Sequence, residues 1–495
     1  MRRIPYILLA AALFLGCNPR LSAPKLAQHK EYIFGREFSR DSIALSEQWW
    51  QMFGDTTLNH LVERALAQNK NIEIAASRIE EARHNLVTTR ATYLPALSGE
   101  ISAEGKYDSA TDNIAQTYQI LPQVSWEIPL FGSLRHATKS AKAQIEYEVW
   151  QYRGVRLSLE AEVANVYFTL LQYRQDLAIA QRSSDLRREM VTLIDSLYHY
   201  GYASGVNLEQ ARSLLYTAEA DIPLYEKAIA QTLLSLATLT GDTPETYINV
   251  GIGKSSAVTN DYRPYDIAIG VPSDLLHRRP DVMSAYYSMQ ECAANVGLAR
   301  SARLPSVTLT LYGGTATSNL GKLFSSEGWI ADALAAITQP IYNFGGLRRR
   351  ELAAREAYKQ SLLAYEQCYI EALSDVESAL VAITSSREEL LRYAGIVKSN
   401  RNIAVMTYAL YRNGLSDYLD VIDAERSLYS SQMQFENLVA QQYINYINLC
   451  KALGGGGGEM RDERRETRDE RRGTRDERRK TKDEGRETRE CRMQN

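Results

Sequence analysis

Apolar residues recur with the period of a coiled coil along two long stretches of the chain, 134–200 and 347–413, neither of which contains a proline. In the second stretch they recur every seven residues, and in the first they alternate steps of four and three. The two series are Leu362, Tyr369, Val376, Ile383, Leu390 and Val397, and Leu159, Val163, Val166, Leu170, Tyr173 and Leu177. Each stretch predicts a helix about 100 Å long. Coiled coils and a generic antiparallel bundle both fit this spacing.

Shorter segments alternate apolar and polar residues with a period of two, which predicts β-strands. From Leu97 to Tyr107 the odd positions are small or apolar and the even positions are polar or charged, and 118–128 and 307–311 alternate in a similar way. A half-buried antiparallel sheet in a soluble protein would also alternate. Because open sheet edges are not tolerated in lipid, strands that enter a membrane would have to be shared between several protomers to close one barrel.

The chain contains an internal duplication with a spacing of about 210 residues. The corresponding segments are 90–95 with 300–305, 129–135 with 340–348, and Gly201 with Gly414. Each half reads helix, strand, strand, long helix, sharp turn, helix, and this plan places a fourth strand over 329–340. The expected units are a first repeat at 56–250, a linker at 251–271 and a second repeat at 272–453.

The N-terminus has the features of an export signal. Two arginines precede a short apolar run that ends at Cys17. The run is shorter than the roughly 20 residues that span a bilayer core, and a short apolar segment before a cysteine favours lipoprotein processing. We therefore expect removal of 1–16, diacylglycerol and N-acyl lipid on Cys17, and an N-terminal anchor and periplasmic segment at 17–55.

Composition and motifs argue against several other functions. The net charge is only −3 and no basic stripe is threaded with aromatic residues, so nucleic acid is not expected as a partner. The five cysteines and six histidines show no metal-ligand or disulfide spacing, and no motif marks an acid, base or nucleophile, so neither an enzyme nor a cofactor is expected. Residues 454–495 combine five glycines with a mixed-charge repeat, which predicts a disordered tail or a lone solvated helix.

One segment carries a family resemblance. Residues 271–282 read Val-Pro-Ser-Asp-Leu-Leu-His-Arg-Arg-Pro-Asp-Val, and Leu304-Pro-Ser follows after a helical segment. With the duplication and the long helices, this signature resembles outer-membrane efflux channels of the TolC/NodT lipoprotein type over nearly the whole mature chain.

The resemblance implies a mostly helical α+β fold with internal duplication. It implies a homotrimer in which four strands from each protomer, twelve in total, form one outer-membrane β-barrel above a long periplasmic α-helical coiled-coil barrel. It also implies export of small molecules such as drugs by passive conduction. The implied partners are a periplasmic adaptor (membrane fusion) protein and an inner-membrane pump of the RND type.

The same resemblance points to a gate. Segment 418–424 is similar to the one in which relatives place aspartates around a constricted pore, so Asp420 and Asp423, with Asp417 and Tyr418 beside them, are the candidate periplasmic aperture residues. Three copies around one axis would attract cations and resist anions. The alternative is that these aspartates only favour the positive N-terminal end of their helix.

The turns between the helices carry a second prediction. The resemblance implies that an adaptor docks at these turns, which contain Gly201, Gly205 and Gly414. Gly201 and Gly414 also suit the left-handed backbone that a reversal between two helices commonly needs.

Two other functions fit the same chain. The duct could serve type I protein secretion, which only its partners would distinguish from efflux. A periplasmic coiled-coil scaffold lipoprotein with a small soluble sheet also fits, and purification without detergent would support it.

Overall fold

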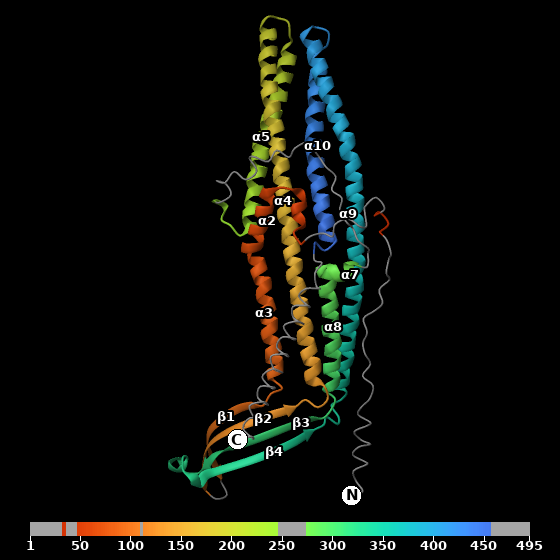
Figure 1. Cartoon of the computed structure of the whole chain (residues 1–495). Coiled ribbons are helices and arrows are strands. Elements are labelled where there is room, and N and C mark those ends of the chain that lie inside the picture. Colours follow the sequence, from red (N-terminus) through yellow and green to blue (C-terminus); the bar gives the residue numbers. More distant parts are fainter. Residues whose placement is uncertain (1–31, 36–46, 109–111, 246–273, 457–495) are drawn as a thin grey trace, which may run out of the picture.

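The computed structural model describes residues 32–35, 47–108, 112–245 and 274–456, and shows an elongated, mostly helical protein with one sheet at its end (Figure 1). Cys17, the expected signal peptide and the linker at 251–271 lie outside the described residues, as does the tail from residue 457 onward. The helices are η1 (Trp49–Phe53), α2 (Thr56–Gln68), α3 (Lys70–Ala91), α4 (Ser133–His199), α5 (Gly205–Thr240), α7 (Leu275–Arg278), α8 (Pro280–Ser301), η3 (Leu320–Lys322), η4 (Ser326–Gly328), α9 (Gly346–Arg412) and α10 (Tyr418–Ala452). The strands are β1 (Ala96–Asp108), β2 (Asn113–Ile128), β3 (Ser306–Thr317) and β4 (Trp329–Thr338).

The two long helices form where the apolar spacing predicts them. α4 and α9 contain 67 residues each, and each begins one residue before the predicted stretch. The heptad positions from Tyr369 to Leu390 are buried, as are Leu159, Val163 and Leu170 in α4. α4 packs along α5, α8 and α10, and α9 packs along α8 and α10. The apolar seams therefore join long helices side by side.

Both long helices begin in the same way, as the duplication predicts. Gly132 and Gly345 are their N-cap residues, with φ of 83° and 78°. Glycine adopts this left-handed conformation at little cost, so the chain can turn sharply from the sheet into the helical body. The prolines at 129 and 340 precede these glycines, in the connections that follow β2 and β4.

The four strands form one antiparallel sheet in the order β1, β2, β3, β4. The sheet lies at one end of the helical body, and the turns that join α4 to α5 and α9 to α10 lie at the opposite end (Figure 1). The duplicated halves thus contribute two strands and one long helical hairpin each.

The main hydrophobic core lies among the helices. Its largest fully buried side chains include Trp49, Trp50 and Tyr167. The Trp49 indole donates a hydrogen bond of 3.0 Å to Glu160, whose other carboxylate oxygen accepts from Arg156 at 3.0 Å. The segment before α2 is thereby fixed against α4.

Within the described residues, no helix has the length and apolar character that crossing a bilayer requires. The same residues bring no three histidine, cysteine, aspartate or glutamate side chains together in a way that could hold a metal ion.

Candidate functional site

One face of the sheet is a continuous apolar surface. The strand register pairs Leu97 with Val124, Val124 with Leu311, and Leu311 with Ala333. The apolar residues that share this face are Leu97, Ile101, Ala103, Ile114, Ile120, Val124, Trp126, Ile128, Val307, Leu309, Leu311, Trp329, Ala331, Ala333, Ala335 and Ile337. The register thus also assigns β4 its apolar positions, which its sequence alone does not reveal.

Within the described residues, most of this apolar face is uncovered. Leu97 and Ile101 are 77% and 79% exposed, and the strands contact chiefly one another rather than the helices. A large exposed apolar surface marks an interface with a protein or a membrane. Strands that are apolar on one face and polar on the other are the pattern of an outer-membrane sheet.

The opposite face is mainly polar on β1, β2 and β3, whereas on β4 it also carries Ile330 and Leu334. The Gln119 amide donates a hydrogen bond of 2.7 Å to the Ser102 hydroxyl, and the Tyr312 hydroxyl donates one of 2.9 Å to Asp332. These cross-strand bonds join polar side chains on the face that would line a water-filled interior.

The sheet has two open edges. Within the described part of the chain, β1 pairs only with β2, and β4 pairs only with β3. The backbone groups along these edges would be unsatisfied in hydrocarbon. The sheet is compatible with lipid only when β1 and β4 pair with strands of other copies.

At the far end of the helices, the predicted turn glycines have the expected geometry. Gly201 and Gly414 have φ of 76° and 69°. Gly205 is the first residue of α5. The side chain of its N-cap residue, Ser204, accepts a hydrogen bond of 3.2 Å from the backbone N–H of Asn207. These three glycines therefore shape two exposed reversals at the end remote from the sheet.

The three candidate aspartates lie on the exposed side of the α10 N-terminus. Asp417 is the N-cap of α10, and its side chain accepts a hydrogen bond of 2.6 Å from the next backbone N–H. Asp420 accepts one of 2.7 Å from the Ser416 hydroxyl. Asp423 is exposed and forms no hydrogen bond or ion pair with the described residues. Two of the aspartates thus also stabilise the start of the helix.

Tyr418 lies apart from these aspartates, in the protein interior. Its side chain is 1% exposed and packs in a cluster with Ile194, Leu208, Val421 and Ile422, which we call the tip cluster. Burial raises the pKa of its hydroxyl to about 12. Tyr418 therefore joins the α9/α10 hairpin to the α4/α5 hairpin.

Polar residues that sequence reasoning missed reinforce this junction. Arg187 on α4 donates a hydrogen bond of 2.8 Å to the carbonyl of Leu214 on α5, and its guanidinium lies 4.9 Å from the centre of the Tyr429 ring on α10. The Tyr429 hydroxyl donates one of 2.7 Å to Asp221 on α5. No local motif marks these residues, because they come from three different helices, and α10 is far from α4 and α5 in the sequence.

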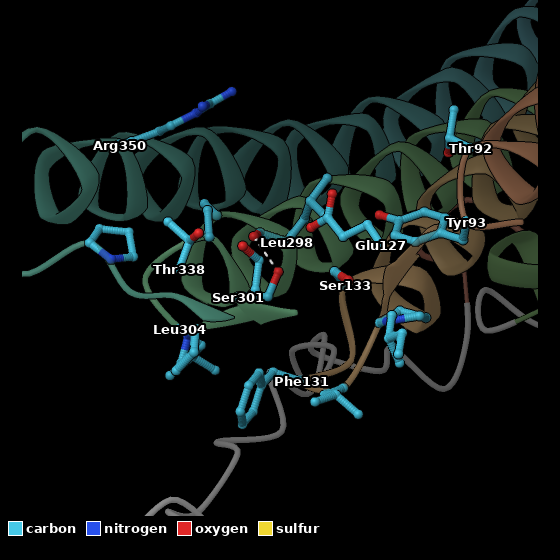
Figure 2. Close-up of a pocket in the computed structure, with 18 of the residues that line it drawn as sticks. Thr92, Tyr93, Glu127, Phe131, Ser133, Leu298, Ser301, Leu304, Thr338 and Arg350 are labelled. Atoms are coloured by element: carbon cyan, nitrogen blue, oxygen red, sulfur yellow. Dashed lines mark hydrogen bonds between the residues drawn. The ribbon is translucent and has the colours of Figure 1, made fainter. Parts of the chain in front are cut away.

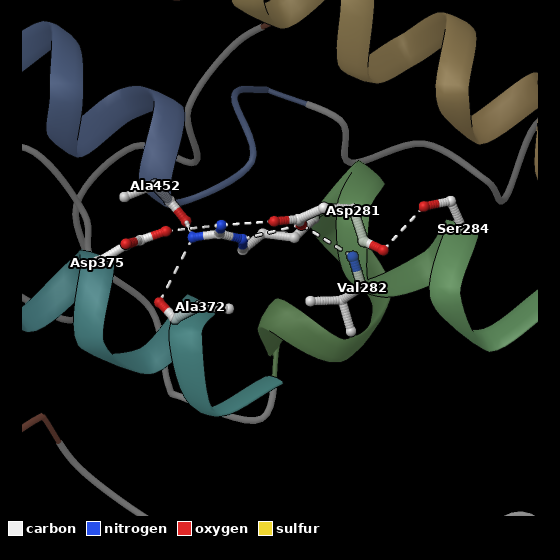
Figure 3. A network of polar contacts seen from close by, with 7 residues as sticks. Asp281, Val282, Ser284, Ala372, Asp375 and Ala452 are labelled. Atoms are coloured by element: carbon white, nitrogen blue, oxygen red, sulfur yellow. Dashed lines mark hydrogen bonds and ion pairs between the residues drawn. The ribbon is translucent and has the colours of Figure 1, made fainter. Parts of the chain in front are cut away.

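Sequence reasoning also gave no role to Arg279, although this residue lies in the signature segment. Its guanidinium donates hydrogen bonds of 3.0 Å to the carbonyl of Ala452, 2.6 Å to Asp281 and 2.9 Å to Asp375 (Figure 3). Arg279 thus ties the last turn of α10 to α8 and α9. The arginine and aspartate on either side of Pro280 were the available signal, but the carbonyl partner depends on the tertiary fold.

A cavity of about 750 Å³ lies where the sheet meets the helices (Figure 2). Its lining comes from the ends of the strands and the adjoining helix termini, and includes Glu127, Ser301 and Thr338. Arg350 extends from α9 away from the other lining side chains (Figure 2). The cavity marks the level at which the sheet gives way to the helical body.

A sheet with one apolar face and two open edges, set at the end of a helical body about 100 Å long, defines a subunit of an outer-membrane channel. A profile of the outer membrane efflux protein family matches residues 61–242 and 271–455, and the chain belongs to this family.

Relatives and a solved structure agree with this assignment. The chain is 30% identical over 421 residues to the pyoverdine export outer membrane protein OpmQ of Pseudomonas putida, covering 83% of this chain and 88% of the relative. It is 28% identical over 413 residues to the cation efflux system protein CusC of Escherichia coli, covering 82% and 88%. The CmeC outer membrane channel of Campylobacter jejuni shares the fold, with a TM-score of 0.84 and 21% identity over 91% of this chain and 97% of that one.

The comparisons confirm the predicted fold class, which is that of the trimeric outer-membrane efflux channels. They also confirm the predicted role of the chain as the outer-membrane component of an efflux system.

Proposed function

We propose that three copies of this chain form one channel that conducts small molecules passively from the periplasm to the exterior. The observation that carries this proposal is the sheet, with its continuous apolar face and its two open edges. Joining β4 of each copy to β1 of the next satisfies every edge, and three four-stranded sheets give a closed barrel of twelve strands. The long helices continue this barrel as a duct.

The proposed partners follow from the ends of the duct. A periplasmic adaptor docks at the turns that contain Gly201, Gly205 and Gly414, and links the duct to an inner-membrane pump of the RND type that supplies the energy. Lipid on Cys17 adds a second attachment to the outer membrane. The names of the relatives cover pyoverdine and cations, which supports small-molecule efflux over type I protein secretion.

The proposed gate lies at the same turns. Asp420 and Asp423 sit on the exposed side of α10, one helical turn apart, so three copies would surround the axis with carboxylates. Their charge would hold cations at the mouth. Tyr418 acts differently: buried in the tip cluster, it holds together the two hairpins whose relative position sets the aperture.

Neighbouring residues of β1 provide the test of the membrane-spanning sheet. Ile101 and Ser102 lie on opposite faces, and Ile101→Arg places a charge on the apolar face whereas Ser102→Arg places it on the polar face. Arginine at a lipid-facing midplane position costs about 2–4 kcal/mol in outer-membrane barrels, while lumen changes are mild. We expect Ile101→Arg to reduce the yield of trimer extracted from outer membranes and Ser102→Arg to leave it close to wild type.

Val124→Arg and Gln123→Arg repeat the comparison on β2. Planar-bilayer recordings then show whether the tolerated variants still conduct. Equal tolerance of both faces would contradict the membrane-spanning sheet.

A further inference from the structure

The connection between β4 and α9 displays an unusual surface. Ile341, Tyr342 and Phe344 are 94%, 77% and 90% exposed. One turn further on, Arg348, Arg349 and Arg350 are also exposed. We call these six residues the junction patch.

The loop that carries the aromatic residues has a defined shape. Phe344 has φ of 55°, which is uncommon for a bulky side chain. The Tyr342 and Phe344 rings lie with their centroids 4.9 Å apart. The Asn343 carbonyl accepts a hydrogen bond of 3.0 Å from the Gly346 amide, which closes the turn into α9. The apolar side chains are thus held outward by a hydrogen-bonded turn.

The arginine charges in the patch are not neutralised by the part of the protein that the structure describes. The nearest acidic residue along the chain, Glu351, is buried and accepts hydrogen bonds of 2.5 Å from Arg303 and 2.6 Å from Arg355. Within the described residues, Arg348, Arg349 and Arg350 form no ion pair. The first turn of α9 contains no acidic residue. The patch therefore presents three guanidinium groups beside three apolar side chains.

The equivalent junction of the first repeat does not have this character. There Phe131 is half-buried, and His136 packs so closely against Gly297 of α8 that an added Cβ atom would lie 2.3 Å from the ring. Only one arginine, Arg135, follows in the first turn. The duplication thus gives two junctions, and only the second is left open and strongly basic.

We propose that the junction patch binds the anionic phospholipid headgroups of the membrane leaflet that faces the helical body. The patch directly follows the apolar face of β4, whose last apolar residue is Ile337, so it lies where hydrocarbon gives way to headgroups. Aromatic side chains favour this level, and guanidinium groups recognise phosphate. The inference rests on the proposed membrane insertion of the sheet.

The test measures lipid selectivity of the reconstituted full-length protein. Spin-labelled phosphatidylglycerol and spin-labelled phosphatidylcholine are compared in vesicles of phosphatidylcholine, and the motionally restricted fraction of each gives their relative association with the protein. We expect about fivefold selectivity for the anionic lipid from each guanidinium group that lies beside its headgroup. Replacing Arg348, Arg349 and Arg350 together with Gln should abolish most of this selectivity, and 0.5 M salt should weaken it in the wild type.

A matched variant removes the same charge elsewhere on α9. Arg392, Lys398 and Arg412 are exposed and lie toward the far end of the helix, so their replacement with Gln should leave lipid selectivity unchanged. Wild-type selectivity in the junction variant would overturn the proposal. Loss of the trimer in this variant would also overturn it, by showing that the arginines contact a neighbouring protomer. Absence of any restricted lipid around the wild type would instead refute membrane insertion itself.

Discussion

Asp176 provides a pH-dependent test of how the helices pack. It lies on α4 with a side chain that is 4% exposed, and its Oδ1 atom has no hydrogen-bond partner within the described residues. Its other oxygen accepts a long hydrogen bond of 3.5 Å from Gln172. Burial, followed by the charge of Glu436 on α10, raises the pKa of Asp176 from 3.8 to about 7. The neighbouring Tyr225 on α5 has a raised pKa as well, again chiefly because of burial.

The pKa shift of Asp176 determines in which direction the stability of the folded protein changes with pH, and how large this change can be. The unfolded chain loses the Asp176 proton near pH 4, whereas the folded protein keeps it until about pH 7. The contribution of this group to stability is therefore greatest below pH 4 and declines as the pH rises to 7. A shift of roughly three units corresponds to about 4 kcal/mol as an upper limit, because water penetration reduces the penalty.

The assay is thermal unfolding of the detergent-solubilised protein, followed by helical circular dichroism between pH 4 and pH 8. Asp176→Asn removes the titrating group while keeping its shape, so it should raise the midpoint at pH 8 and flatten its decline with pH. Asp185→Asn on the same helix is the control, because Asp185 is 73% exposed and its ion pair with Arg188 is worth little. An Asp176→Asn protein that is no more stable than wild type at pH 8 would refute the reasoning.

Three further predictions concern the anchor, the gate and the signature segment. Cys17→Ser should give a protein that no longer incorporates a tagged fatty acid, whereas continued labelling would exclude Cys17 as the lipidated residue. Replacing both Asp420 and Asp423 with Ala should weaken block by multivalent cations from the periplasmic side and reduce cation preference in planar bilayers; unchanged recordings would restrict them to helix stabilisation. Arg279→Leu should destabilise the protein by about 1–3 kcal/mol, because it leaves the carbonyls of the buried residues Ala372 and Ala452 without their hydrogen-bond donor, and a wild-type thermal midpoint would contradict this expectation.

The sequence predicted the elements of this protein closely. The two long helices were placed to within one residue, because prolines and glycines mark their ends and the apolar spacing continues between them. The alternation of β1 was sufficient to assign Ile101 and Ser102 to opposite faces, since side-chain direction in a strand has a period of two. The duplication then supplied β4, whose own pattern was too weak to identify it.

The candidate site was predicted less completely. Gly201 and Gly414 have the left-handed conformation expected of them, because that requirement is local. Tyr418 was grouped with the gate aspartates, but the structure buries it in the tip cluster between the two hairpins. Which residues of α10 face inward depends on how α4 and α5 pack against it, and no pattern within α10 contains that information.

The sequence by itself determined the helix lengths, the strand faces and the family signature, because each arises from residues close together in the chain, and it determined the duplicated plan, because a repeat can be recognised without knowing any contact between its halves. Only the tertiary structure decided which apolar strands share one face, that Asp176 is buried, and that Arg279 meets the end of α10. Each of these depends on contacts between residues far apart in the sequence. The chain can encode such contacts only through the packing of whole helices and strands, which is why they become visible only in the folded protein.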